Sequence, residues 1–357
     1  MLTIIEFHQE ENYLSDFLTF PNQLYQPTFL TQKPAEEAAL LKNKHPLSHY
    51  FKLRPFLVYD KQQVVGRFGL TFYPNSDTAY LGFFECINNP NVAQTIFKHA
   101  AKISRQQKCH KIIGPVDCSF WIGYRLKTNL FNRRPYFGEP YNLAYYPDFF
   151  KQAGFNFQHQ YVSHLYRRPP LFTAHLTKKY QQRHQLFKSK NYKIISPKAS
   201  DFDQTLTTIQ TLIMKLYQDF PAFHPISLAD YRKYFSNFRQ ISNLSLIKLA
   251  FYHDQAVGFF IGLPNYGTWL NQPLNFWSHL RISLQKFWSP SYVMLYMGVL
   301  PEHRGLGKAL LKPIITQMYL RRAEAVGALI QNHKPTATYL EPHIKSEFTY
   351  SLLEKKL

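Results

Sequence analysis

Cysteine, acidic residues and long apolar runs are all scarce in this chain of 357 residues. The three cysteines, Cys86, Cys109 and Cys118, show no paired spacing, which argues against a disulfide framework or a structural zinc site. No segment approaches the ~20 apolar residues that span a bilayer. Residues 1–11 are acidic and lack the apolar region of a signal peptide. We therefore expect a cytoplasmic protein that holds no metal ion, with attachment to the inner face of the membrane as an alternative.

The shortage of acidic residues leaves the chain strongly basic. It has 42 Lys and Arg residues against 22 Asp and Glu residues, so the formal net charge is +20. Such a chain attracts anions, which include nucleic acids, acidic lipid headgroups and polyphosphate cofactors. The basic residues are spread along the sequence without a long run of like charges, and no zinc-finger or RNA-binding signature is present. Nucleic acid is therefore the least favoured of these partners.

Two pairs of segments recur at nearly the same spacing. Residues 56–72 and 246–263 are each an apolar run around a polar turn, which indicates a hairpin. Residues 146–155 and 339–348 also resemble each other. Because a chain of this length has room for about two domains, we predict two copies of one fold. Chance similarity of short segments is the alternative.

After its hairpin, each copy is predicted to contain a strand, a helix and a second strand. These elements are 79–86, 92–106 and 111–116 in the first copy, and 292–300, 306–325 and 328–331 in the second. A strand–helix–strand unit implies a parallel pair of strands joined by a right-handed crossover. We therefore expect an α/β fold of two tandem domains, each a mixed twisted sheet flanked by helices.

The stretch from Val299 to Leu311 reads VLPEHRGLGKALL and stands between an apolar strand and an amphipathic helix. Glycines before a helix allow a ligand to approach the backbone closely. The first amides of the helix have no partner within it, and with the helix dipole they form an anion site that suits a pyrophosphate. Lys308 adds a positive charge to this site. An ordinary tight turn of another α/β protein is the alternative interpretation.

This loop resembles the acyl-CoA loop of the GNAT superfamily of N-acyltransferases, whose pattern is matched here by Arg304, Gly307 and Ala309. The resemblance implies two tandem GNAT-like domains and acetyl-CoA or a longer acyl-CoA as the co-substrate. It assigns cofactor binding to Val299, Arg304, Gly305, Leu306, Gly307, Lys308 and Ala309. One departure from the usual helix is Pro313, which is expected to kink it.

The resemblance extends beyond this helix. In the family the next strand ends near an Asn, and a Tyr follows on a short helix; Asn332 and Tyr339 have the matching spacing. By resemblance, Asn332 would contact the pantetheine arm and Tyr339 would protonate the departing thiolate. Backbone amides of residues 298–300 would bind the developing oxyanion. Residues 345–348 lack the family's usual Gly-Phe pair, and a tyrosine of the core is the alternative for Tyr339.

The first copy lacks such a loop, because residues 88–91 read NNPN in its place. We expect this copy to serve structure or acceptor recognition. Scattered segments, among them 83–86, resemble a bacterial family of tandem GNAT-like proteins that is loosely similar to bacterial ceramide synthase. That resemblance implies a lipid-type amine as the acceptor. The predicted domains are 1–165 and 201–357, with 166–200 as a linker.

An acceptor amine must lose a proton before it attacks a thioester, so a general base is expected. Asp117 is one candidate, because it follows the end of a predicted parallel strand, where ligand sites are common. Glu139 is the other, within the aromatic segment 137–141. A structural role is the alternative for each of them.

Residues 269–288 form a basic, Trp-rich segment in which Phe276, Leu280, Leu284 and Phe287 share one helical stripe. Such a segment suits either an anionic membrane surface or packing over its own domain. The sequence as a whole predicts an acyl-CoA-dependent N-acyltransferase that moves an acyl group to an amine by direct attack. An aminoacyl-tRNA-dependent transferase, a non-catalytic CoA-binding protein and a peripheral membrane protein are the alternatives.

Overall fold

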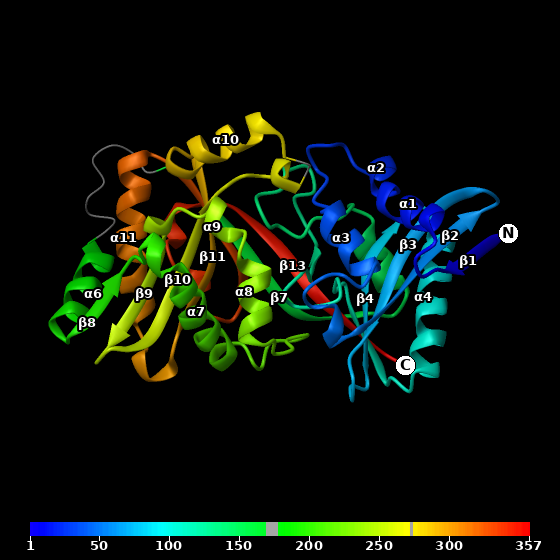
Figure 1. Cartoon of the computed structure of the whole chain (residues 1–357), viewed down its shortest axis with the longest axis horizontal. Coiled ribbons are helices and arrows are strands. Elements are labelled where there is room, and N and C mark those ends of the chain that lie inside the picture. The colour runs from blue at the N-terminus through cyan, green and yellow to red at the C-terminus, as the bar shows by residue number, and fades with distance from the viewer. Residues whose placement is uncertain (169–177, 272–273) are drawn as a thin grey trace.

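Strands from both halves of the chain form one mixed sheet of 13 strands in the computed structural model, which describes residues 1–168, 178–271 and 274–357. The helices of the first half lie at the right of Figure 1 and those of the second half at the left. The strands of the first half are β1 (Leu2–Glu6), β2 (Lys52–Asp60), β3 (Gln63–Phe72), β4 (Thr78–Cys86), β5 (Lys111–Gly114), β6 (Leu126–Lys127) and β7 (Asn156–Tyr166). Its helices are α1 (Glu11–Thr19), α2 (Pro21–Leu24), α3 (Pro34–Leu41), α4 (Pro90–Gln106) and α5 (Tyr146–Gln152).

The second half repeats this plan with its own elements. Its strands are β8 (Tyr192–Ile195), β9 (Ile247–Tyr252), β10 (Gln255–Pro264), β11 (Ser291–Val299), β12 (Glu324–Gln331) and β13 (Ile344–Lys356). Its helices are α6 (Lys178–Ser189), α7 (Phe202–Leu216), α8 (Leu228–Phe235), α9 (Phe238–Ile241), α10 (Phe276–Phe287) and α11 (Leu306–Arg321).

Both halves build the same unit in the same order, which confirms the predicted tandem α/β fold. The antiparallel hairpin of β2 and β3 corresponds to that of β9 and β10. In the first half, β4 is followed by α4 and then by β5, which pairs parallel with β4. In the second half, β11, α11 and β12 repeat this arrangement, again with a parallel pair of strands.

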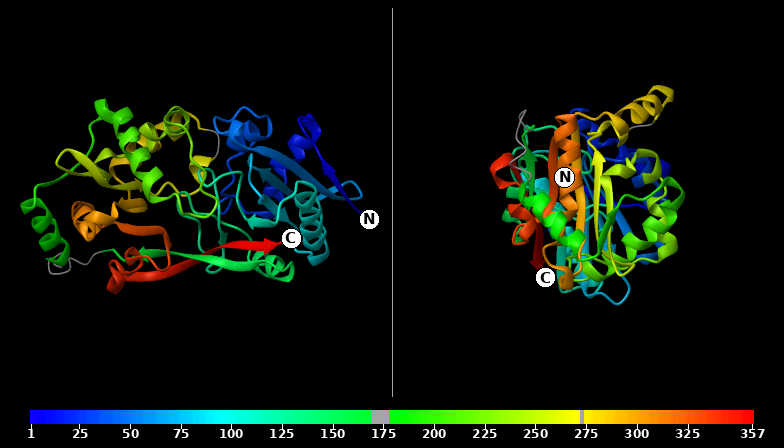
Figure 2. Two further views of the ribbon diagram at one scale, coloured as in Figure 1. Left: turned by 90° about the horizontal axis from the view of Figure 1, so that it is seen from below. Right: turned by 90° about the vertical axis from the view of Figure 1, so that its left-hand side faces the viewer.

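The closing strands of the two halves are exchanged. The order of twelve of the strands across the sheet is β1-β2-β3-β4-β5-β13-β7-β12-β11-β10-β9-β8, and the short strand β6 pairs with β13 off this path. The last strand of the second half, β13, therefore pairs with β5 of the first half, and the last strand of the first half, β7, pairs with β12 of the second. Both views show β13 and β7 running side by side along the molecule (Figures 1 and 2). This exchange makes one continuous sheet and holds the two halves against each other.

Three large hydrophobic clusters and one small one surround this sheet. One cluster joins α1 and α3 of the first half to α7 and α8 of the second, on one side of the strands. On the opposite side, α4 and α5 cover the first half and α6 and α11 cover the second. The alternation of β2 shows the division, because Leu57 belongs to the first cluster while Phe56 and Val58 face α4. Among the described residues, no helix is both long enough and apolar enough to cross a membrane.

The second copy departs from its predicted boundaries after α11. We predicted a helix over 306–325, whereas α11 ends at Arg321 because Arg322 has a left-handed backbone (φ = +49°). Residues 324–327 instead pair with β11, so β12 begins at Glu324. Sequence periodicity missed this boundary, since the pairing with β11 is a tertiary contact.

Part of the predicted linker, 166–200, lies within the second half. Tyr180 and Phe187 of α6 are buried in the cluster beneath α11, and β8 forms the edge of the sheet beside β9. Residues 169–177 of this interval lie outside the described residues. We keep 1–165 and 201–357 as a proposed division along the chain.

Candidate active site

The loop between β11 and α11 leaves the N-terminus of α11 open. Gly305 precedes the helix with φ = +96°, a left-handed conformation that favours glycine, and no side chain caps the helix. At the same point of the first half, the side chain of Asn89 accepts a hydrogen bond of 2.9 Å from the amide of Asn91. The two copies therefore differ at this end: α4 satisfies an amide internally, whereas α11 leaves its first amides for a ligand.

Basic side chains gather at the open end of α11. Arg304 and Lys308 belong to the loop and the first turn, and α6 brings Arg183 against Gly305, with its Nη1 atom 3.9 Å from the position that a Cβ there would occupy. Burial and the nearby charges of Lys179 and Arg183 lower the pKa of Lys308. Among the described residues, none of these basic side chains forms an ion pair with a carboxylate. Like charges without a counter-charge form a site for a polyanion.

Strands β11 and β12 separate before they reach the loop that precedes α11. Their parallel pairing runs from Ser291 and Glu324 to Met294 and Gly327 and ends there. The amide of Leu300 donates to the carbonyl of Val257 on the β10 side at 2.9 Å. Because amide directions alternate along an antiparallel ladder, the amide of Val299 points away from β10, toward the gap between β11 and β12. This is a suitable donor for a carbonyl oxygen that binds in the gap.

Tyr339 closes the opposite side of this gap. Its hydroxyl oxygen lies 3.2 Å from the position that a Cβ on Gly307 would occupy, and Lys308 Nζ lies 5.5 Å from the centroid of its ring. Burial raises the pKa of Tyr339, so the hydroxyl stays protonated at neutral pH. The residue lies between two 3₁₀ turns, at 335–338 and 341–343, and not on the short helix that the resemblance predicted.

A cavity of about 1220 Å³ connects this gap to the groove between the halves. Its wall includes Val299, Arg304, Gly305, Gly307, Lys308 and Tyr339. Leu306 and Ala309 belong to α11, are fully buried against the sheet and do not line the cavity. Asn332 is exposed, and its backbone amide donates to the backbone carbonyl of Gln160 at 3.1 Å. Its neighbour Gln331 lines the cavity, whereas Asn332 does not.

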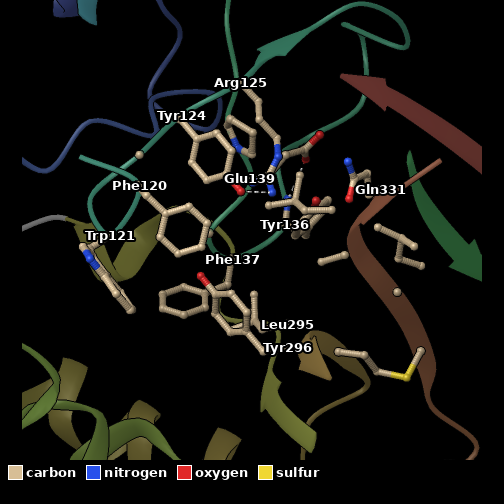
Figure 3. Close-up of a pocket in the computed structure, with 18 of the residues that line it drawn as sticks. Phe120, Trp121, Tyr124, Arg125, Tyr136, Phe137, Glu139, Leu295, Tyr296 and Gln331 are labelled. Carbon is tan, nitrogen blue, oxygen red and sulfur yellow. Dashed lines mark hydrogen bonds between the residues drawn. The ribbon is translucent and has the colours of Figure 1, made fainter. Parts of the chain in front are cut away.

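Aromatic side chains line the middle of the cavity, between the two halves. They are Phe120, Trp121, Tyr124, Phe137, Tyr217, Phe220 and Tyr296, which we call the aromatic chamber. In Figure 3, Phe120 and Tyr124 of the first half face Leu295 and Tyr296 of the second across this space. Large, mostly apolar rings of this kind suit an acyl chain or the apolar part of an acceptor.

Asp117 lines the first-half end of the cavity. Its Oδ1 atom accepts a hydrogen bond of 2.7 Å from the amide of Phe83 on β4. Burial raises the pKa of Asp117 to about 6. In the first half, the carboxylate of Asp117 thus lies between β4 and β5, at the position where the second half has the gap between β11 and β12. Because Asp117 bonds the amide of Phe83 and Asn89 caps α4, the first half has no equivalent of the open site at α11.

Glu85 lies at the same end of the cavity. Its Oε2 atom accepts hydrogen bonds from the hydroxyls of Tyr25 (2.7 Å) and Tyr146 (2.6 Å). Burial raises the pKa of Glu85 to about 7, although the charge of Arg67 opposes this shift. Arg67 itself is paired with Glu37 at 2.7 Å. Glu85 therefore changes its charge close to neutral pH, about one pH unit above Asp117.

Both carboxylate oxygens of Glu139, the second predicted base, are already bonded within the protein. Its carboxylate pairs with Lys127 at 2.5 Å, and both side chains are fully buried. It also accepts hydrogen bonds from the hydroxyl of Tyr350 (2.6 Å) and from the amide of Tyr136 (3.1 Å). These contacts tie the closing strand β13 to the first half. Asp117 is therefore better placed than Glu139 to accept a proton from a ligand.

Three residues of the site were not among the predicted ones. Arg183 lies in the interval that we assigned to the linker, where a single basic residue carries no signal of its own. Glu85 belongs to the segment 83–86, which we used only for its resemblance to other proteins. Arg125, in the wall of the aromatic chamber, follows no motif, and only the folded chain shows that it faces a cavity.

Comparison with known proteins bears on the fold. No protein-family model matches the sequence, and no curated protein matches it. Among solved structures, a tandem GNAT protein from the clavulanic acid biosynthesis pathway, determined without acetyl-CoA, aligns with 100% of this chain and 98% of its own at 11% identity and a TM-score of 0.55. The glucosamine N-acetyltransferase region of a fungal multi-domain β-N-acetylglucosaminidase aligns with 99% of this chain and 38% of its own at 12% identity and a TM-score of 0.56. The chain therefore has the tandem GNAT fold.

Proposed function

We propose that this protein is an acyl-CoA-dependent N-acyltransferase whose donor site is the open end of α11. The observation that carries the proposal is the cluster of Arg183, Arg304 and Lys308 at a helix N-terminus that no side chain caps. The phosphates of CoA are a polyanion of the kind that such a cluster attracts. The tandem GNAT fold supports the same assignment, because this fold is shared with acetyltransferases.

The residues around the gap suit transfer from a thioester to an amine. Acyl-CoA supplies an activated acyl group. The amide of Val299 would donate to the thioester carbonyl and stabilise the charge that develops on its oxygen. Tyr339 would donate a proton to the departing sulfur. With a pKa of about 6, Asp117 is ionised at neutral pH and is the proposed base, acting directly or through water.

The aromatic chamber supports an apolar acyl chain or acceptor. Phe120, Trp121 and Phe137 present hydrophobic surface far larger than an acetyl group requires. We therefore include a long-chain acyl donor and a lipid-type amine in the proposal; the resemblance to bacterial ceramide synthase stays a prediction. Transfer from an aminoacyl-tRNA is the second candidate, favoured by the net charge of +20.

Native mass spectrometry of the purified protein, followed by titration with acetyl-CoA and palmitoyl-CoA, tests the donor. We expect one of these thioesters to bind, and the tighter one indicates the chain length. Release of free CoA in the presence of a panel of amines then separates an enzyme from a CoA-binding protein. Failure of both thioesters to bind, together with binding of tRNA, would replace this proposal by the tRNA-dependent one.

We also propose that α10 attaches the protein to an anionic membrane. Its inner face is anchored by Ile282, and Gln285 donates to the carbonyl of Asn265 at 2.7 Å. Its outer face exposes large apolar side chains, with Trp277 at 72% and Trp288 at 82% of their full area. Helix α10 lies along the upper edge of the second half (Figure 1).

Basic residues border this apolar face. Arg281 and Lys286 belong to α10, and Arg321 of α11 donates to the carbonyl of Phe287 at 2.7 Å. No acidic residue lies in the segment 269–288, although residues 272–273 of it are outside the described residues. Exposed tryptophans flanked by positive charges suit the interface of an anionic bilayer.

A further inference from the structure

Arg125 is a partly buried cation in the wall of the aromatic chamber. Its guanidinium carbon lies 3.7 Å from the ring centroid of Tyr124 and 4.1 Å from that of Tyr161, so the group contacts both rings, which are nearly perpendicular to each other. The backbone of Arg125 has φ = +99°, a region that side chains other than glycine rarely adopt. Strain of this kind persists where the surrounding structure holds a residue in a particular place, often at a binding site.

No carboxylate balances the charge of Arg125. All 22 acidic residues of the chain lie in its described part, and none of them forms an ion pair with this guanidinium. One guanidinium nitrogen donates to the hydroxyl of Tyr124, while Nε is buried without a hydrogen-bond partner among the described residues. Two fully buried cations of the same half are paired, Arg67 with Glu37 and Lys127 with Glu139. A charged group with an inaccessible nitrogen and no counter-charge is costly unless a ligand supplies one.

The position of Arg125 suits contact with the acceptor amine rather than with the acyl-CoA donor. It lies in the first half, at the opposite side of the chamber from Leu295 and Tyr296 of β11, as Figure 3 shows. The basic side chains Arg183, Arg304 and Lys308, which also line the cavity, are the proposed phosphate ligands at the end of α11. A second, separate cation in the chamber therefore has no role in holding CoA.

We propose that Arg125 binds an anionic group of the acceptor, so that the acceptor is an amine that also carries a carboxylate or a phosphate. The flat guanidinium pairs with either group through two parallel hydrogen bonds. Its contacts with the rings of Tyr124 and Tyr161 hold the guanidinium in place. This inference rests on the proposed function, because the amine of the same molecule would then point to the thioester in the gap.

Two matched pairs of amines test this proposal by calorimetry with the protein free of CoA. L-phenylalanine is compared with 2-phenylethylamine, which lacks only the carboxylate, and phosphoethanolamine is compared with ethanolamine. We expect the acidic member of at least one pair to bind at least about tenfold more tightly, as a charge-assisted hydrogen bond requires. The pair that shows the preference identifies the anion as carboxylate or phosphate. Equal affinities within both pairs, or no binding of either acid, overturn the proposal.

The variant Arg125→Met removes the charge and keeps much of the apolar stem. We expect it to lose the preference for the acidic amine and Arg125→Lys to keep part of it. Binding of CoA, measured in the same variants, is expected to stay unchanged and shows that the fold is intact. If Arg125→Met keeps the preference, Arg125 is not the site. If the wild type shows the preference but binds no CoA thioester, the proposed donor fails while the anion site stands.

Discussion

The hydroxyl oxygen of Tyr339 lies 3.2 Å from the position that a Cβ atom on Gly307 would occupy. Residue 339 follows β12, whereas residue 307 is in the first turn of α11, so the contact joins the two walls of the gap. It places a hydroxyl with a raised pKa next to the uncapped first amides of α11. The same closeness leaves little room for any side chain at position 307.

Gly307→Glu is expected to abolish binding of acetyl-CoA. The new side chain would meet Tyr339 and place a negative charge where phosphates bind. The measurement is calorimetric titration with acetyl-CoA. Asn91→Glu is the matched control, because it adds the same charge in the first turn of α4, whose N-terminus is capped by Asn89. Equal affinity in the wild type and in Gly307→Glu would remove α11 as the donor site.

Arg183→Gln is expected to weaken CoA binding by about 10- to 100-fold, the loss of one charge-assisted hydrogen bond to a phosphate. The affinity of the variant should also depend less steeply on salt concentration. Lys188→Gln, an exposed position on the same helix, is the control and should bind CoA as the wild type does. Identical affinities for the two variants would show that α6 does not take part in binding.

Tyr339→Phe should lower kcat by about 100-fold and leave the affinity for CoA nearly unchanged, because it removes a proton donor and keeps the ring. Single-turnover measurements of thiol release with an accepted amine report this step. A loss of CoA affinity with unchanged kcat would instead assign Tyr339 to binding. Tyr319→Phe, in the last turn of α11, is the control for the loss of a hydroxyl.

Glu85→Gln is expected to change how stability depends on pH. The folded protein binds a proton at Glu85 more tightly than the unfolded chain does, because the pKa rises from 4.5 to about 7. The stability due to this group is complete below pH 4.5 and is lost as the pH rises to about 7. Between pH 4.5 and 8 the wild type should lose up to about 3 kcal/mol relative to Glu85→Gln.

Urea unfolding at both pH values measures this difference in the free energy of unfolding. The control is Asp219→Asn, which removes an exposed carboxylate. A difference between wild type and Glu85→Gln that stays constant with pH would mean that Glu85 titrates in the folded protein as it does in the unfolded chain.

Removal of the exposed indoles of α10, by Trp277→Ser with Trp288→Ser, should weaken binding to vesicles of phosphatidylcholine and phosphatidylserine by roughly tenfold or more. Cosedimentation measures this binding, and vesicles of phosphatidylcholine alone should bind the wild type more weakly. Leu186→Ser, which removes an exposed apolar side chain from α6, is the control. Absence of wild-type binding to the anionic vesicles would contradict attachment through α10.

Local sequence was sufficient for the open end of α11 and for the succession of strands and helices. The stretch Val299–Leu311 carries its strand, its glycines and its helix within a few residues of one another, so its conformation follows from neighbouring positions. The apolar spacing of α4 indicated its buried face, and Val92, Ile96, Ala100 and Ile103 are indeed buried. The recurrence of segments along the chain indicated two copies, since each copy repeats the same local pattern.

The tertiary structure alone decided how those copies meet and what their groove contains. The exchange of β7 and β13 depends on pairing between strands far apart in the chain. The approach of Arg183 to Gly305 joins α6 to α11. The contact of Arg125 with Tyr161 requires a strand that begins some thirty residues later. The sequence by itself determined a helix end that attracts an anion, because that property is local. Burial, in contrast, is a property of the folded chain. Only when distant segments bury one another do they form the aromatic chamber, place Arg125 in its wall and raise the pKa of Glu85.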